Sequence, residues 1–184
     1  MSAAGSEKTY DVVLLVEQPL SPQDAQQVRS LHEELDEPVR YHLLLPVEDA
    51  AARVESAMGS LAASEVLASP ALVMDEEDLE TIQHELLENA RRDLSASLGR
   101  LTDAGADAVG DIVSVDPIDA LAAKVAAVDG REAIILTRPH VVAEFFHMDW
   151  TSRARRKIGV PVLHLLEHET FDEQAGGGEG VTGF

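Results

Sequence analysis

The 184-residue sequence predicts an α/β fold, with a parallel sheet between layers of helices. Short apolar runs alternate along the chain with longer segments of helical periodicity. The runs are nearly continuous rather than alternating, as is typical of strands covered on both faces. Helix-start signals stand after two of them, SPQD at residues 21–24 and DPID at residues 116–119. Because parallel strands need crossover helices, usually right-handed ones, this order favours a single doubly covered sheet.

The first two strands are expected at Tyr10–Glu17 and Val39–Val47, with a helix between them. Ser21 is a suitable N-cap, Pro22 a suitable first helical residue, and Asp24 a favourable charge in the first turn. The apolar stripe of this helix is expected to continue until Pro38 ends it, at positions Ala25, Val28, Leu31 and Leu35.

A long helix is expected from an N-cap at Asp75 to about Thr102, after an alanine-rich, helical segment at residues 48–68. Gly105 stands where a C-terminal glycine belongs. The apolar period of the long helix runs through Leu79, Ile82, Leu86, Ala90, Ser97 and Leu101.

The second half of the chain predicts three more strands, at Ala108–Val115, Glu132–Thr137 and Pro161–Glu167. Asp116 and Pro117 begin the clearest helix of the chain, and Gly130 is expected to end it. Its apolar stripe consists of Ile118, Leu121, Val125 and Val128.

Composition narrows the function classes. The chain has no cysteine, which excludes disulfides, thiolate metal sites and cysteine nucleophiles. Its formal net charge of -20 argues against general nucleic-acid binding. With no membrane-length apolar run and no signal peptide, we expect a cytoplasmic protein. Residues 1–8 are expected to be a flexible N-terminus, 9–168 the domain, and 169–184 a disordered acidic and glycine-rich tail.

The second half of the sequence carries motifs in a familiar order. Gly105 precedes a strand, DPIDAL at residues 116–121 opens a helix, AIILT forms the next strand, and VPVLHL at residues 160–165 forms the last. In this order the chain resembles the universal stress protein (UspA-like) family. The resemblance implies an adenine nucleotide alpha hydrolase-like sheet ordered 3-2-1-4-5 with helices on both faces. It also implies a homodimer, with the fifth strand near its interface, and ATP beyond strands 1 and 4.

The sequence departs from the family at its nucleotide loop. Nucleotide-binding members carry G-x2-G-x9-G-[ST], whose glycines let backbone amides approach phosphates. Here no glycine occurs between Arg131 and Ile158, Pro139 lacks an amide donor, and Glu17 replaces the family's aspartate. We therefore expect no cofactor, with ATP disfavoured. The residues that would line the degenerate cleft are Glu17, Thr137, Arg138, His140 and Arg153.

The loop after the fourth strand leaves alternatives open. Arg138 with Arg153 or Arg156 could replace the amides, since guanidinium groups suit phosphate. The simpler interpretation is that Arg155, Arg156 and Lys157 complement the end of a short helix. His140, His147 and Asp149 could bind a metal, and the simpler interpretation is that the two histidines are surface or packing residues. The aromatic set is expected to plug the cleft, or otherwise to form a partner-binding patch: Phe145, Phe146, Met148 and Trp150.

The remaining histidines suggest no catalytic site. His42 and His164 lie within predicted strands and are expected to pack or pair, whereas His32 and His84 are expected on helix surfaces without clear partners. No nucleophile elbow, phosphate-binding loop or HExxH motif is present. The sequence thus favours a non-catalytic regulatory or stress-associated homodimer that acts through an unknown protein partner, not through nucleic acid or membrane. If Leu165 faces the dimer partner, Leu165→Lys is expected to give monomer or aggregate.

Overall fold

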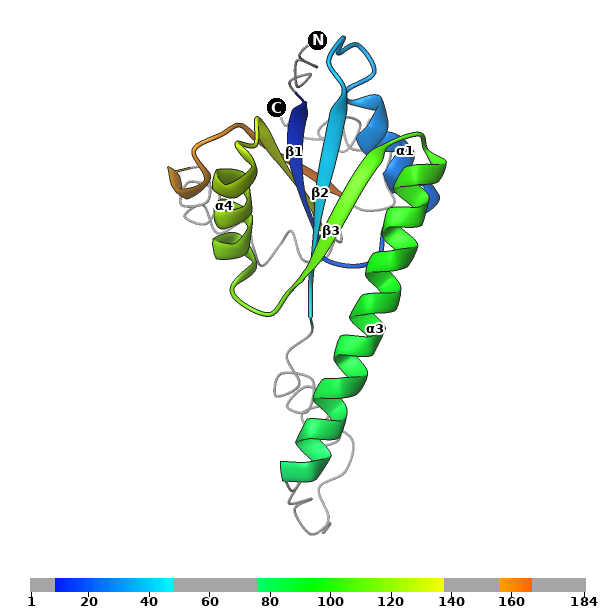
Figure 1. Ribbon diagram of the computed structural model, residues 1–184, viewed down its shortest axis with the longest axis vertical. Coiled ribbons are helices and arrows are strands. Elements are labelled where there is room, and N and C mark those ends of the chain that lie inside the picture. Colours follow the sequence, from blue (N-terminus) through cyan, green and yellow to red (C-terminus); the bar gives the residue numbers. More distant parts are fainter. Residues whose placement is uncertain (1–8, 48–75, 138–155, 167–184) are drawn as a thin grey trace, which may run out of the picture.

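The sheet has five parallel strands in the order β3-β2-β1-β4-β5, as the resemblance implied (Figure 1). The computed structural model describes residues 9–47, 76–137 and 156–166 of the chain. The strands of the described parts are β1 (Tyr10–Val16), β2 (Val39–Pro46), β3 (Asp107–Val113), β4 (Glu132–Thr137) and β5 (Val162–Leu166). The helices are α1 (Pro22–Ser30), α3 (Glu76–Asp103) and α4 (Pro117–Val128).

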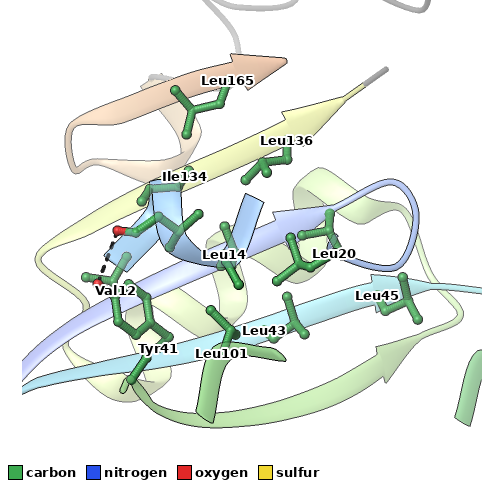
Figure 2. Packing of buried hydrophobic residues seen from close by; sticks show 14 residues of the cluster. Val12, Leu14, Leu20, Tyr41, Leu43, Leu45, Leu101, Ile134, Leu136 and Leu165 are labelled. Carbon is green, nitrogen blue, oxygen red and sulfur yellow. Dashed lines mark hydrogen bonds between the residues drawn. The ribbon is translucent and has the colours of Figure 1, made fainter. Parts of the chain in front are cut away.

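Helices cover both faces of the sheet, which explains the continuous apolar runs of the strands. On one face, Leu14, Leu43 and Leu136 pack with Leu20 at the entry to α1 and Leu101 of α3 (Figure 2). On the other face the strands pack against α4 and Ile158, through Val13, Leu15, Leu44, Ala133, Ile135, Leu121 and Val125. Each fully buried aliphatic side chain contributes roughly 1.5–3 kcal/mol of transfer free energy. Central strands therefore cannot slip by one residue without exchanging the two cores.

The predicted helix starts are confirmed. Ser21 accepts a hydrogen bond from the Asp24 backbone N–H while the Asp24 carboxylate accepts one from the Ser21 N–H, which completes a capping box. Asp116 accepts from the N–H groups of Ile118 and Asp119, at 3.0 Å each. These local hydrogen bonds fix the residues at which α1 and α4 begin.

Three element boundaries were expected at Gly105, Gly130 and Val115; the first is confirmed and the other two differ. Gly105 has φ 81° behind α3, as predicted. At the end of α4, however, the left-handed residue is Asp129 (φ 52°) rather than Gly130. Gly130 is buried, and a Cβ there would lie 3.3 Å from Val13 Cγ2, so close packing is what favours glycine. The third strand ends at Val113, two residues earlier than expected, and Val115 is 64% exposed.

The expectation that α1 extends through Leu35 is wrong. The helix ends at Ser30, and the chain continues with hydrogen bonds of the i to i−3 kind, from His32 N–H to Arg29 C=O and from Leu35 N–H to His32 C=O. These tighter turns rotate Leu35 to the surface, where it is 42% exposed. The same turns direct His32 inward.

The expectation that His32 is a surface residue without a partner is also wrong. It is 5% exposed, with Nδ1 2.7 Å from Tyr41 Oη and Nε2 2.5 Å from Glu132 Oε1. The Tyr41 hydroxyl donates to the Val28 C=O, and Tyr10 donates to Glu132 Oε2. Burial, above all, raises the pKa of Tyr41 to about 12. We call these four side chains, His32, Tyr41, Glu132 and Tyr10, the amino-end network, because Tyr10 and Glu132 begin β1 and β4.

The remaining expectations concern two histidines, Leu165 and segments that the structure does not describe. His84 is exposed on α3, as predicted, and His42 pairs within the sheet, with Nε2 2.7 Å from Asp11 Oδ1. Leu165 is 2% exposed and packs in the core, so it does not face a partner from this position. The expected N-cap at Asp75, the helix at residues 48–68, the N-terminus and the tail lie outside the described residues.

Candidate functional site at the carboxyl ends of the strands

The topological switch point of the sheet lies between β1 and β4, because the strand order reverses there. Val16 pairs with Leu136, and the Glu17 N–H donates to the Leu136 C=O at 3.1 Å. Glu17 and Thr137 are therefore neighbours at the carboxyl ends of these strands. Both are half-buried, so two of the five predicted cleft residues are brought together.

The Thr137 side chain is hydrogen-bonded to β5. Its Oγ1 lies 2.8 Å from Nε2 of His164, which confirms the expectation that His164 packs or pairs. Burial lowers the pKa of His164 below its usual value. A neutral ring at this position adds no positive charge to the switch point at neutral pH.

The other predicted cleft residues, Arg138, His140 and Arg153, lie outside the described residues. The same holds for the possible metal ligands His147 and Asp149 and for the aromatic set, Phe145, Phe146, Met148 and Trp150. Within the parts of the chain that the structure describes, no group of three or more metal-ligating side chains is found.

The end of the basic cluster is described from Arg156 onward. Residues 156–158 are helical, and Gly159 follows with φ 74°. Lys157 Nζ forms an ion pair with Asp119 in the first turn of α4. Arg156 and Lys157 thus lie in a short helix before Gly159, as expected, and Lys157 pairs with an acid of α4, a contact the sequence did not predict.

A cavity of about 390 Å³ lies at the carboxyl ends of β1 and β2, next to the switch point, with which it shares Glu17. Its wall from the β1 side consists of Glu17, Gln18 and Pro19. Its remaining lining comes from the end of β2 and from α3, namely Leu45, Pro46, Leu86, Asn89, Ala90, Arg92 and Asp93. The helix can reach this position because its 28 residues continue past the carboxyl ends of the strands (Figure 1).

The loop that forms one wall of the cavity is fastened to α3. Leu20 is 1% exposed, and its N–H donates to Ser97 Oγ at 3.1 Å. The Leu20 C=O accepts from the guanidinium of Arg100. Ser97 in turn donates to the Asp93 C=O at 2.8 Å. Both backbone groups of one loop residue are thus bound by side chains of the helix that forms the opposite wall.

Sequence reasoning identified Glu17 but missed the cavity and its α3 wall. The apolar period of α3 did include Leu86, Ala90 and Ser97, and all three are buried as predicted. A small residue at Ala90 and a hydroxyl at Ser97 within this stripe were the available signals. Neither signal shows that the end of β2 lies opposite these residues, where Leu45 and Pro46 complete the lining.

Comparisons with known proteins bear on the fold. No family model matches the sequence, and no curated protein matches it. Among solved structures, the hypothetical protein MJ0577 is 14% identical, with a TM-score of 0.57 over 88% of this chain and 98% of that chain. The hypothetical protein PH0823 is 18% identical, with a TM-score of 0.51 over 86% and 97%.

A universal stress protein family protein from Arabidopsis thaliana, solved with AMP bound, is also similar. It is 13% identical, with a TM-score of 0.50 over 86% of this chain and 92% of that chain. The described helices include none that is long and apolar enough to cross a membrane. The likeness extends over most of each chain and includes the strand order, so this chain has the fold of the universal stress proteins.

Proposed function

We propose that this chain is a universal stress protein-like regulatory or stress-associated protein of the cytoplasm, without catalytic activity, that acts through protein contacts. The observation that carries the proposal is the composition of the switch point. A Glu17 carboxylate stands at the end of β1, beside a strand β4 whose following loop contains no glycine. Backbone amides cannot approach a polyphosphate closely where every residue carries a side chain.

The expected energetic cost supports this reading. Charge-assisted hydrogen bonds contribute roughly 1.5–3 kcal/mol each, so the loss of two or three weakens binding by factors of hundreds or more. Glu17 adds a negative charge near the phosphates, within a chain whose net charge is -20. The neutral state favoured for His164 supplies no compensating charge from β5.

Titration calorimetry with Mg-ATP and with AMP tests the proposal. We expect at most weak binding, with a Kd of about 0.1 mM or higher, because a micromolar affinity weakened by factors of hundreds or more falls into that range. A Glu17→Gln variant, which keeps the side-chain size but removes the charge, is the matched control. Micromolar affinity in the wild type contradicts the proposal.

A second candidate function is the binding of an adenine nucleotide or another anion through arginines. Two observations favour it. The cavity has the volume of a small-molecule site, and a protein of the same fold was solved with AMP bound. Affinity that disappears in Arg138→Ala but persists in Arg131→Ala would establish this second function, since Arg131 directly precedes β4, at the opposite end of that strand.

We further propose that the protein is a homodimer with β5 at or near the interface. β5 is an edge strand without a charged residue, and its Leu163 is 38% exposed. An uncharged apolar edge is normally covered in a soluble protein. Because Leu165 is buried, the suitable test is Leu163→Lys, with Val109→Lys on the opposite edge strand β3 as the control; Val109 is 45% exposed.

Sedimentation equilibrium at micromolar concentration measures the outcome. We expect a dimer for the wild type and for Val109→Lys, and a monomer for Leu163→Lys. A monomeric wild type ends the dimer proposal and leaves the nucleotide question untouched.

A further inference from the structure

The edge strand β3 presents backbone groups that another chain can use. It pairs in parallel with β2, and no strand of the described residues lies along its other side (Figure 1). Such an edge carries a row of free N–H and C=O groups, to which an extended segment of a partner can add as a further strand. The opposite edge strand, β5, has no charged residue, whereas β3 carries Asp107 and Asp111. The two edges therefore suit different partners.

The two faces of β3 have different neighbours. On one face, a Cβ at Gly110 would lie 2.7 Å from Leu94 Cδ1, so α3 packs closely over this side of the strand. Because side chains alternate along a strand, Asp107, Val109 and Asp111 lie on the opposite face, and all three are exposed. The helix on that side of the sheet, α4, packs against β1, β2 and β4. An Asp-x-Val-x-Asp row is thus accessible at the edge of the sheet.

The two aspartates of this row contribute little to the stability of the fold. Asp107 Oδ2 accepts a hydrogen bond from Arg40 Nε of β2 at 2.7 Å, and Asp111 Oδ2 accepts one from Lys124 Nζ of α4 at 2.5 Å. The side chains of both aspartates are more than half exposed, and ion pairs at such positions add little stability. Each of these pairs uses the Oδ2 oxygen, so the Oδ1 oxygens remain available to a cation placed alongside β3.

The same row disfavours the pairing of β3 with a second copy of itself. In the antiparallel register that sets the two exposed valines opposite each other, Asp107 faces Asp111 of the partner subunit, and the second pair repeats this contact. Like charges directly opposite on neighbouring strands are destabilising, whereas opposite charges are stabilising. The net charge of -20 adds a long-range repulsion between copies and attracts basic chains. The row therefore fits a strand that has one apolar side chain between two basic ones.

We propose that β3 is the docking edge for a basic, extended segment of a partner protein, which adds a strand to the sheet. An apolar side chain of that segment lies beside Val109, and a lysine or arginine lies beside each of Asp107 and Asp111. These positions recur at every second residue, which is the spacing of side chains that share one face of a strand. The inference rests on the proposed action through protein contacts, and it names the surface and the chemical class of the partner.

A titration of the ¹⁵N-labelled full chain with short peptides, followed by NMR, tests this proposal. The probe SKTVTKS carries the proposed Lys-x-Val-x-Lys row, SETVTES replaces both lysines by glutamate, and KKSTVTS scrambles the composition of the first. We expect saturable shifts with SKTVTKS at the amides of β3, and slower hydrogen exchange at those amides of the strand that point outward. SETVTES should bind at least about tenfold more weakly, because two attractive cross-strand pairs become repulsive, and the scrambled peptide should not saturate.

Charge reversal on the protein separates this edge from a general attraction to an acidic chain. Asp107→Lys combined with Asp111→Lys should weaken SKTVTKS at least about tenfold and should strengthen SETVTES. Glu80→Lys combined with Glu85→Lys makes the same change of net charge at exposed positions of α3, and should leave SKTVTKS binding within about twofold. Val109→Lys should weaken SKTVTKS as well, and it carries the test if the first double variant does not fold. Spectra without peptide establish that each variant is folded.

Two results overturn the proposal. Equal binding of SKTVTKS and SETVTES shows that the aspartates of β3 do not select a basic partner. The absence of saturable shifts at β3 shows that the charges of this edge serve only to prevent aggregation. Either result leaves the regulatory function standing, because that function is decided by calorimetry with Mg-ATP at the other end of the argument, where β1 meets β4.

Discussion

The amino ends and the carboxyl ends of this sheet are built in different ways. At the amino ends, the amino-end network joins the turn after α1 to β1, β2 and β4 through hydrogen bonds among buried or half-buried rings and one carboxylate. The Arg131 guanidinium lies 5.1 Å above the Tyr10 ring and covers the network from outside. At the carboxyl ends of β1 and β2, by contrast, the side chains leave a cavity of about 390 Å³.

The difference shows that one end supplies rigidity and the other supplies space. These four hydrogen-bonded polar side chains fix the relative positions of three strands and the turn after α1. The cavity end is fastened to α3 through the backbone of Leu20. In open α/β sheets, ligands bind outside the carboxyl ends of the strands, which is the end where this cavity lies.

The largest expected effect comes from removing His32. His32→Ala leaves the Glu132 carboxylate and the Tyr41 hydroxyl without their ring partner, and it empties a buried position. We expect a loss of about 3 kcal/mol in the free energy of unfolding, at the lower end for a buried pair because Glu132 is 24% exposed. Urea denaturation measures it. His84→Ala, at an exposed histidine of α3, should change stability by less than about 0.5 kcal/mol, and equal effects would show that the network stabilises nothing.

A smaller effect is expected at the fastening of the cavity wall. Ser97→Ala removes the acceptor of the buried Leu20 N–H and should cost roughly 1–2 kcal/mol. Ser95→Ala, two residues earlier and exposed, is the control and should be nearly neutral. If both substitutions have the same effect on urea denaturation, the bond from Leu20 to Ser97 does not hold the loop.

The smallest effect is a pH dependence at the carboxyl ends. Burial lowers the folded-state pKa of His164, so the unfolded state binds the proton more readily. The stability contribution is therefore present above the unfolded pKa of about 6.5 and is lost as the pH falls below it towards the lower folded value. His164→Gln can keep a hydrogen bond to Thr137 but does not titrate. The wild type should lose more stability than this variant between pH 7.5 and pH 5, and parallel curves would argue against the shift.

The sequence predicted best those features that local signals decide. Ser21 and Asp116 were recognisable as N-caps from the residues that follow them, and the strand order followed from the resemblance. The end of α1 was mispredicted because Leu31 and Leu35 continue the helical period, although turns begin at Leu31. The contact of His32 with Glu132 joins residues 100 positions apart, and no periodicity reports such a pair. The cavity could not be predicted for the same reason, because its lining residues come from the end of β2 and from α3, which are far apart in the sequence.

The fastening of Leu20 also has a consequence for the timescale on which this part of the molecule opens. An amide in a connecting loop ordinarily exchanges its hydrogen with solvent through small local fluctuations, within minutes or faster. The Leu20 N–H, however, is buried and bound to a side chain of α3, so its release requires the loop to separate from the helix. Its exchange should therefore be as slow as that of the neighbouring strand amides of β1. The wall of the cavity would then belong to the same cooperative unit as the sheet.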